Sequence, residues 1–274
     1  MGREVLVETH YGRGQILDSI LGALRAMGKD TEKLLPVDLA PVDEFHIRGR
    51  EATIELANRA ALRPGVRVLD VGCGLGGSAR YLAAEHGCRV VGIDLTREYI
   101  EAASDLARRV GLGGSVEFRQ ASALELPFDD EFDVVWTEHV QMNIADKRAF
   151  YAELARVLKR GGKLVFHDIF AGNGGPVHLP VPWAETADIS FLAMPEEAFA
   201  IVEKLGLRFT ERSDRTAQAR AWFEATLERL AQSGPPPLGL HLLMGPTARV
   251  KFGNMLRNLQ EARIAVWQAV AEKT

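Results

Sequence analysis

The sequence predicts an α/β protein built around a mostly parallel sheet with helices on both faces. Two observations support this fold class. Short apolar runs alternate with helix-forming segments between residues 66 and 170, and the connections between them are short. The chain has 274 residues, of which 47% are hydrophobic and 26% charged. That is enough for one such domain with additions, and it is ordinary for a soluble globular protein.

The first part of the chain predicts a helical cap ahead of the sheet. Residues 15–27 place their apolar side chains on one helical face. A polar, proline-containing stretch covers residues 29–50, and helix resumes at 51–62, where an Arg-Pro-Gly sequence ends it. We therefore expect an N-terminal helical cap over residues 1–50 and the main domain over residues 51–274.

The alternating region predicts the strands and helices of the sheet in turn. Strands are expected at 66–71, 88–94, 115–120, 132–137 and 161–170, and helices at 77–85, 97–110 and 146–158. In sheets of this kind ligands lie beyond the carboxyl ends of the strands, where the strand order reverses.

The residues after 170 predict a lid and the end of the sheet. The loop 171–191 is long and rich in Gly, Pro and aromatic residues, which is typical of a lid or pocket wall. Residues 263–270 fit either a last strand or a continuation of the preceding helix. Further elements are expected at 195–205 (helix), 207–212 (strand), 214–232 (helix) and 247–262 (helix). The full prediction is a Rossmann-like sheet of seven strands with a lid insertion after strand 5, its acceptor-side elements at 171–195 and roughly 214–262.

Charge and cysteine content exclude several classes of protein. The 33 basic and 37 acidic residues give a net charge of −4, which offers no basic surface for nucleic acid or an anionic membrane. The two cysteines, Cys73 and Cys88, belong to no metal-binding cluster, so we expect reduced thiols, no metal and a cytoplasmic location. No segment resembles a signal peptide or a membrane span. A monomer or a homodimer would fit equally.

A glycine cluster follows the first expected strand, in VLDVGCGLGGSARYLA at residues 68–83. Its spacing, G-x-G-x-x-G, is often that of a dinucleotide site. Asp70, however, stands two residues before the first glycine, where its charge would repel a diphosphate. S-adenosylmethionine (SAM) has no phosphate and carries an ammonium and a sulfonium, so an acid suits it. Asp94, at the end of the second strand, can accept from ribose hydroxyls of either cofactor.

Several segments together resemble the class I SAM-dependent methyltransferases. They are VLDVGCGLGG, VVGIDLT, LPFDDEFDVVWTEH and RVLKRGGKLVFHDI, in the family's order. The resemblance implies SAM as cofactor, S-adenosylhomocysteine as product, and cofactor contacts from Asp70, Gly72, Gly74, Gly77, Asp94, Leu95, Ser122, Ala123 and Glu138. One departure is Ser122, which stands where the family commonly has an acid that accepts from the adenine amino group.

Candidate catalytic residues follow the expected strands. His139 comes directly after the fourth strand and could act as a base or orient an acceptor hydroxyl, or it could be held by backbone contacts alone. Of the adjacent His167 and Asp168, only one can face the ligand in a regular strand, and we favour Asp168. Tyr11, expected ahead of the first helix, could cover the sulfonium or simply pack beneath that helix.

The acceptor is less clearly encoded. His46, His178 and Trp183 are candidate acceptor contacts, although Trp183 could also serve only as an apolar anchor for the loop. The whole chain resembles sarcosine/dimethylglycine N-methyltransferases, natural-product sugar O-methyltransferases and quinone-biosynthesis methyltransferases. We therefore expect transfer of methyl to an oxygen or nitrogen of a small molecule. The alternatives are carbon methylation of a prenyl or aromatic acceptor, and a non-catalytic SAM sensor or partner subunit.

Overall fold

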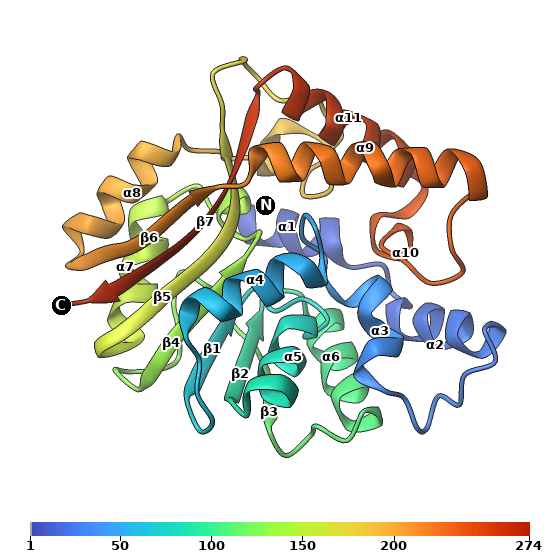
Figure 1. Cartoon of the computed structure of the whole chain (residues 1–274), viewed down its shortest axis with the longest axis horizontal. Helices are drawn as coiled ribbons and strands as arrows, with labels where there is room; N and C mark the ends of the chain where they lie inside the picture. Colours follow the sequence, from blue (N-terminus) through green and yellow to red (C-terminus); the bar gives the residue numbers. More distant parts are fainter. Residues whose placement is uncertain (1) are drawn as a thin grey trace.

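A seven-stranded sheet forms the centre of the molecule (Figure 1). The computed structural model describes residues 2–274. The strands are β1 (Arg67–Val71), β2 (Arg89–Asp94), β3 (Val116–Gln120), β4 (Phe132–Glu138), β5 (Leu158–Ala171), β6 (Leu207–Asp214) and β7 (Ile264–Lys273). Their order is β3-β2-β1-β4-β5-β7-β6. Neighbours are parallel from β3 to β5, and β7 is antiparallel to both β5 and β6. The predicted fold class is confirmed, and the last segment is a strand.

Eleven α-helices surround the sheet within residues 2–274. They are α1 (Arg3–Tyr11), α2 (Ile16–Ala26), α3 (Pro36–Asp43), α4 (Arg50–Ala60), α5 (Gly77–His86), α6 (Arg97–Arg109), α7 (Lys147–Val157), α8 (Pro195–Lys204), α9 (Thr216–Ser233), α10 (His241–Met244) and α11 (Ala248–Gln260). The sequence predicted neither α1 nor α3. No residue of α1 is fully buried, so it carries no apolar stripe, and the prolines of α3 suggested a loop although Pro36 only begins the helix.

Apolar layers hold helices to both faces of the sheet. Alternate residues of a strand point to opposite sides, as Val134 and Val135 of β4 illustrate. Val134 packs in a cluster with residues of α4 and α5, whereas Val135 packs in a cluster with residues of α7 and α8. The sheet is therefore covered on both faces, and only its ends are open to ligands.

Elements from both ends of the chain lie over the carboxyl ends of the strands. Figure 1 shows α9 and α11 side by side on one side of this edge, with α1 between them and the sheet. Glu98 of α6 fixes the segment after α1, because its carboxylate accepts from the N–H groups of Arg13 (2.6 Å), Gly14 (2.8 Å) and Ile16 (2.8 Å). Within residues 2–274, no helix combines the length and apolar character that crossing a bilayer requires.

Candidate active site

The carboxyl ends of β1, β2, β4 and β5 open onto one large cavity. Its volume is about 250 Å³, close to the lower end of the roughly 300–1,000 Å³ of a pocket for one drug-sized ligand. The strand order reverses between β1 and β4, so the cavity lies at the topological switch point of the sheet. This position was expected.

The glycine loop after β1 forms the floor of the cavity. The N–H groups of Gly72 and Cys73 both donate to the carbonyl of Ile93, which ties the loop to β2 (2.8 and 2.9 Å). Gly72 has a φ of 74°, and a Cβ there would overlap the Val140 side chain. Gly74 has a φ of 53° and no atom within 4 Å of the position of a Cβ, so its surface faces open space.

Gly77 lies outside this cavity, which differs from the expectation for it. It begins α5, and a Cβ at this position would overlap the backbone carbonyl of Asp43. Gly77 therefore permits close packing of α5 against the end of α3. Gly76, which the spacing did not single out, has a φ of 79°, and a Cβ there would overlap the Phe118 ring. The third glycine of the motif thus serves packing between elements.

Asp94 lines the cavity at the end of β2. Its Oδ2 accepts from the N–H of Gly74 (2.9 Å) and its Oδ1 from the N–H of Thr96 (2.8 Å). Burial raises the pKa of Asp94, and these two N–H groups oppose the rise. Leu95 lines the cavity beside it. The carboxylate is thereby fixed to the glycine loop with lone pairs left for a ligand.

Two further carboxylates lie behind the glycine loop. Asp70 and Glu138 are buried and line a smaller adjoining cavity of about 40 Å³. Glu138 accepts through Oε2 from the indole N–H of Trp136 (2.8 Å) and the hydroxyl of Ser78. Asp70 Oδ2 and Glu138 Oε1 have no hydrogen-bond partner among residues 2–274. Burial, then the neighbouring Glu138 charge, raises the pKa of Asp70. An unpaired buried acceptor such as Asp70 Oδ2 suits a cationic ligand.

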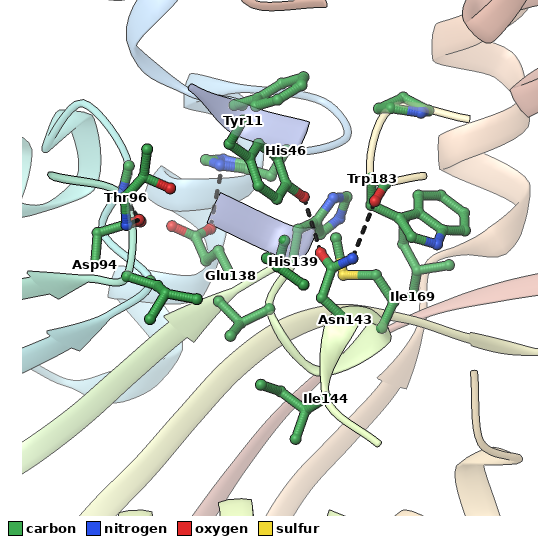
Figure 2. Close-up of a pocket in the computed structure, with 18 of the residues that line it drawn as sticks. Tyr11, His46, Asp94, Thr96, Glu138, His139, Asn143, Ile144, Ile169 and Trp183 are labelled. Carbon is green, nitrogen blue, oxygen red and sulfur yellow. Dashed lines mark hydrogen bonds and ion pairs between the residues drawn. The ribbon is translucent and has the colours of Figure 1, made fainter. Parts of the chain in front are cut away.

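His46 connects these acids to the segment before α4. Its Nε2 lies 3.4 Å from Glu138 Oε1 (Figure 2) and 3.3 Å from Glu44 Oε2. Burial alone would lower the pKa of His46, but Glu138 and Glu44 outweigh it and raise the value to about 9. The sequence pointed to His46 as an acceptor contact. In the structure it lines the cavity as an imidazolium held between two carboxylates.

His139 occupies a left-handed turn directly after β4. Its φ is 54°, an uncommon backbone conformation for a residue other than glycine. Its N–H donates to the carbonyl of His167 (2.9 Å), and the side chain lines the cavity. Burial, followed by the charges of His167 and His46, lowers the pKa of His139 well below its ordinary value. We expected the pKa of His139 to lie near neutral pH, whereas the structure lowers it, so that the imidazole is uncharged.

Asp168 does not face the cavity, contrary to our expectation. Its Oδ2 accepts from the N–H groups of Val140 and Gln141 (both 3.2 Å), so it supports the turn that carries His139. Burial raises the pKa of Asp168 to about 7 against the effect of these donors. His167 is also turned away, with Nε2 3.0 Å from the carbonyl of Ile47. Both residues therefore support the turn after β4, His167 through its backbone carbonyl and Asp168 through its carboxylate.

Tyr11 is the last residue of α1, not a residue ahead of the first helix. Its hydroxyl donates to Oδ1 of Asn143 (2.9 Å), and Nδ2 of Asn143 donates to the carbonyls of Trp183 (3.0 Å) and Ile189 (2.8 Å). Figure 2 shows this chain of contacts across the cavity. Burial raises the pKa of Tyr11, so the hydroxyl stays protonated and can donate. Asn143, which the sequence did not single out, joins the amino-terminal helix to the lid loop.

The remaining predicted residues divide between the cavity and its surroundings. Trp183 lines the cavity, with its indole N–H donated to Ser190 (3.0 Å). His178 lies outside it and pairs with Glu261 at 2.8 Å. Ala123 lines the cavity, whereas Ser122 does not; its hydroxyl donates to the carboxylate of Glu4. Glu4 of α1 thus brings an acid to the segment where the sequence lacked one.

The cavity also has an apolar wall from the segment 214–262, which the sequence assigned to the acceptor side without singling out these residues. Its members come from α9, α10 and α11 and are Trp222, Phe223, Met244, Phe252 and Met255. An aromatic residue on an amphipathic helix has the same pattern whether it packs in a core or faces a ligand, so periodicity could not distinguish them. Within residues 2–274, no group of three or more His, Cys, Asp or Glu side chains is arranged to hold a metal ion.

Comparison with known proteins identifies relatives along most of the chain. A family model described as "Methyltransferase domain" matches residues 69–166. Methyltransferase GfsG from Streptomyces halstedii is 34% identical over 194 residues, which cover 69% of this chain and 70% of that protein. The glycine/sarcosine/dimethylglycine N-methyltransferase of Actinopolyspora halophila is 30% identical over 223 residues, 81% of this chain but only 39% of that longer protein.

Solved structures share the fold. The structure of phosphoethanolamine N-methyltransferase 2 from Haemonchus contortus, in complex with S-adenosyl-L-methionine, superposes with a TM-score of 0.74 at 21% identity. The match covers 97% of this chain and 60% of that one. At this identity the likeness supports the arrangement of strands and helices, and not the identity of an acceptor.

Proposed function

This chain belongs to the class I SAM-dependent methyltransferases, and from that premise we propose that it transfers methyl to an oxygen or nitrogen of a small molecule held beside His139. One observation carries the proposal. A neutral imidazole, fixed in a left-handed turn, lines the same cavity as the glycine loop and Asp94. Methylation of a hydroxyl requires a base beside the cofactor site. An unprotonated amine needs no base, only alignment with the methyl group of SAM.

The residues of the cavity fit SAM. The unpartnered, buried Oδ2 of Asp70 suits an ammonium, with Glu138 close by in an ion pair with His46, and Asp94 suits ribose hydroxyls. The open face of Gly74 allows a ligand to approach the backbone. When bound, SAM supplies an electrophilic methyl group on a positively charged sulfur. The residues proposed to hold it are Asp70, Gly72, Gly74, Asp94, Leu95, Ala123 and Glu138.

The adenine end of the site combines two elements. Ala123, Leu95 and Glu4 line the cavity. The hydroxyl of Ser122, which does not line it, donates a hydrogen bond to the carboxylate of Glu4. We propose that the carboxylate of Glu4 accepts the hydrogen bond from the adenine amino group, in place of the acid that the family commonly has at Ser122. This contact would also link α1 to the cofactor, so that α1 excludes water from the cavity when the site is filled.

His139 is proposed to take the proton of an acceptor hydroxyl. Its imidazole is in the free-base form at neutral pH because burial and the neighbouring histidines disfavour the charged form. The carbonyl of His167 fixes the backbone of the turn, and Asp168 fixes the two residues that follow it. These supports keep the ring in one place while the acceptor and methyl donor are aligned.

A screen with methyl-labelled SAM tests this proposal. Purified protein is incubated with amines (including sarcosine and dimethylglycine), phenols, sugars and prenyl diphosphates, and products are identified by mass spectrometry. We expect a labelled methyl on oxygen or nitrogen of at least one acceptor. A label found on carbon would contradict the proposed chemistry, and tight SAM binding without any labelled product would favour a non-catalytic role.

A further inference from the structure

One wall of the cavity is formed by aromatic and methionine side chains of α9 and α11. Trp222 stacks on Phe252 with ring centroids 6.3 Å apart, and Phe223 meets Phe252 edge-on at 5.5 Å. Phe223 and Met255 are buried, whereas Trp222 and Phe252 are half-buried. Half-buried aromatic rings on a cavity wall leave apolar surface that a ligand can cover.

Basic residues near the cavity are already paired. Arg48 pairs with Glu55 at 2.7 Å, and Arg50 pairs with the buried carboxylate of Glu44. Neither lines the cavity.

The buried lysines are occupied in the same way. The ammonium of Lys147 donates to the backbone carbonyls of Gln141, Ile144 and Phe191. Lys251 is fully buried and pairs with Glu185 at 2.6 Å. Because each lysine is already surrounded by acceptors, neither offers a free charge to an incoming anion.

The charged side chains that do face the cavity are mainly acidic. The lining acids are Glu4, Asp94, Glu138 and Asp146, and among residues 2–274 the cations on the wall are Arg3 and the imidazolium of His46. His46 is already paired with the carboxylates of Glu44 (3.3 Å) and Glu138 (3.4 Å). Arg3 is exposed, and its guanidinium lies 5.3 Å from the centre of the Phe191 ring. A carboxylate or phosphate carried deep into the cavity would lose its hydration and meet only a cation, His46, whose charge Glu44 and Glu138 already balance.

We propose that Trp222, Phe223, Phe252 and Met255 bind the body of an uncharged, largely apolar acceptor that bears a hydroxyl group. The same wall selects against acceptors that carry a carboxylate or a phosphate. This inference rests on the proposed function, which supplies the methyl donor on the other side of the cavity. It deepens that function by naming the class of acceptor.

Matched probes test the inference directly. Calorimetry measures the binding of 2-naphthol and of 2-naphthyl phosphate to the protein saturated with S-adenosylhomocysteine. We expect 2-naphthol to bind at least about ten-fold more tightly than its phosphate, because only the neutral probe enters without an unpaired charge. Trp222→Ala should weaken 2-naphthol binding by about ten-fold, and Leu227→Ala, on the same helix but away from the wall, should not.

A second variant keeps the test independent of folding. Trp222→Leu preserves an apolar side chain and should give an intermediate loss, whereas Trp222→Arg should reverse the preference toward the phosphate. Equal or tighter binding of 2-naphthyl phosphate to the wild type, or no binding of either probe, would overturn the inference while leaving methyl transfer intact. Failure to bind S-adenosylhomocysteine in the same calorimeter would instead overturn the proposed function and this inference with it.

Discussion

The two sides of the cavity are built in different ways. The cofactor side consists of the glycine loop, Asp94 and Glu138, which follow three strands of the parallel sheet and are joined by short polar contacts. The acceptor side consists of apolar side chains from the lid loop and from helices near the end of the chain. The first is proposed to bind one fixed ligand, SAM, through backbone geometry and charge. The second can change its shape by side-chain substitution while the first stays intact.

His139 lies where the two sides meet, and its loss should have the largest effect. His139→Asn should lower turnover by about 10²–10⁴-fold, the usual contribution of a positioned general base. Asparagine tolerates the left-handed backbone at this residue, so the turn should be preserved. SAM affinity, measured by calorimetry, should change little because the imidazole is proposed to serve the acceptor.

His178→Ala provides the matched control for that variant. His178 pairs with Glu261 outside the cavity, so its removal should leave turnover unchanged. If His139→Asn retains full turnover on an identified acceptor, the turn at the end of β4 has only a structural role. If both variants lose turnover equally, the loss does not come from the base.

Asp94→Ala should affect the cofactor side alone. Removing the carboxylate leaves the N–H groups of Gly74 and Thr96, and the proposed ribose hydroxyls, without an acceptor. We expect SAM binding to weaken by about 1–3 kcal/mol, the scale of unsatisfied buried hydrogen-bonding groups. Glu101→Ala on the exposed face of α6 is the control and should bind SAM normally in calorimetry. Unchanged affinity of Asp94→Ala would remove this residue from the site.

The same contrast explains what the sequence could predict. Gly72, Gly74 and Asp94 lie within a short stretch, so spacing alone brought them together and the strand pattern placed them at one edge of the sheet. The prediction for Asp168 was wrong. Side-chain alternation implied that either His167 or Asp168 faces the ligand, but contacts with neighbouring backbone groups hold both side chains away from the cavity.

For the acceptor side, the sequence indicated the segments 171–195 and 214–262 but not the individual residues that line the cavity. Trp222 and Phe252 are far from the glycine loop in sequence and have the spacing of ordinary core residues. Only packing of α9 against α11 brings their rings together on the cavity wall. Tyr11 and Asn143 meet for the same reason, through a hydrogen bond between residues 132 positions apart. Contacts of this kind depend on tertiary structure and leave no local pattern.

A pH measurement tests the charged network behind the cofactor side. The pKa of His46 is raised to about 9 in the folded protein, above its unfolded value of about 6.5. The folded state therefore keeps a proton that the unfolded state has lost. The stabilisation is complete below about pH 6.5 and is lost as the pH rises through 9, by at most about 1.4 kcal/mol per pH unit for one proton.

Thermal unfolding between pH 7 and 10 measures this effect. Tm should fall more steeply with pH for the wild type than for His46→Gln, which lacks the titrating group. His86→Gln, at the end of α5, should keep the wild-type slope. Parallel slopes for wild type and His46→Gln would show that Glu44 and Glu138 do not hold a proton on His46.

Tyr11→Phe should have the smallest effect on binding. The variant tests whether α1 belongs to the cofactor side or the acceptor side of the cavity. The variant removes only the hydroxyl that donates to Asn143, whose amide in turn holds the backbone of Trp183. The lost hydrogen bond is worth about 0.5–1.5 kcal/mol. Since that contact leads to the lid loop, the acceptor KM should rise by about 2–12-fold, the equivalent of that free energy, while the Kd of SAM stays near the wild-type value. Tyr81→Phe, outside the cavity on α5, is the matched control. A change in SAM affinity with an unchanged acceptor KM would place Tyr11 with the cofactor instead, and the division between the two sides would then run through α1 itself.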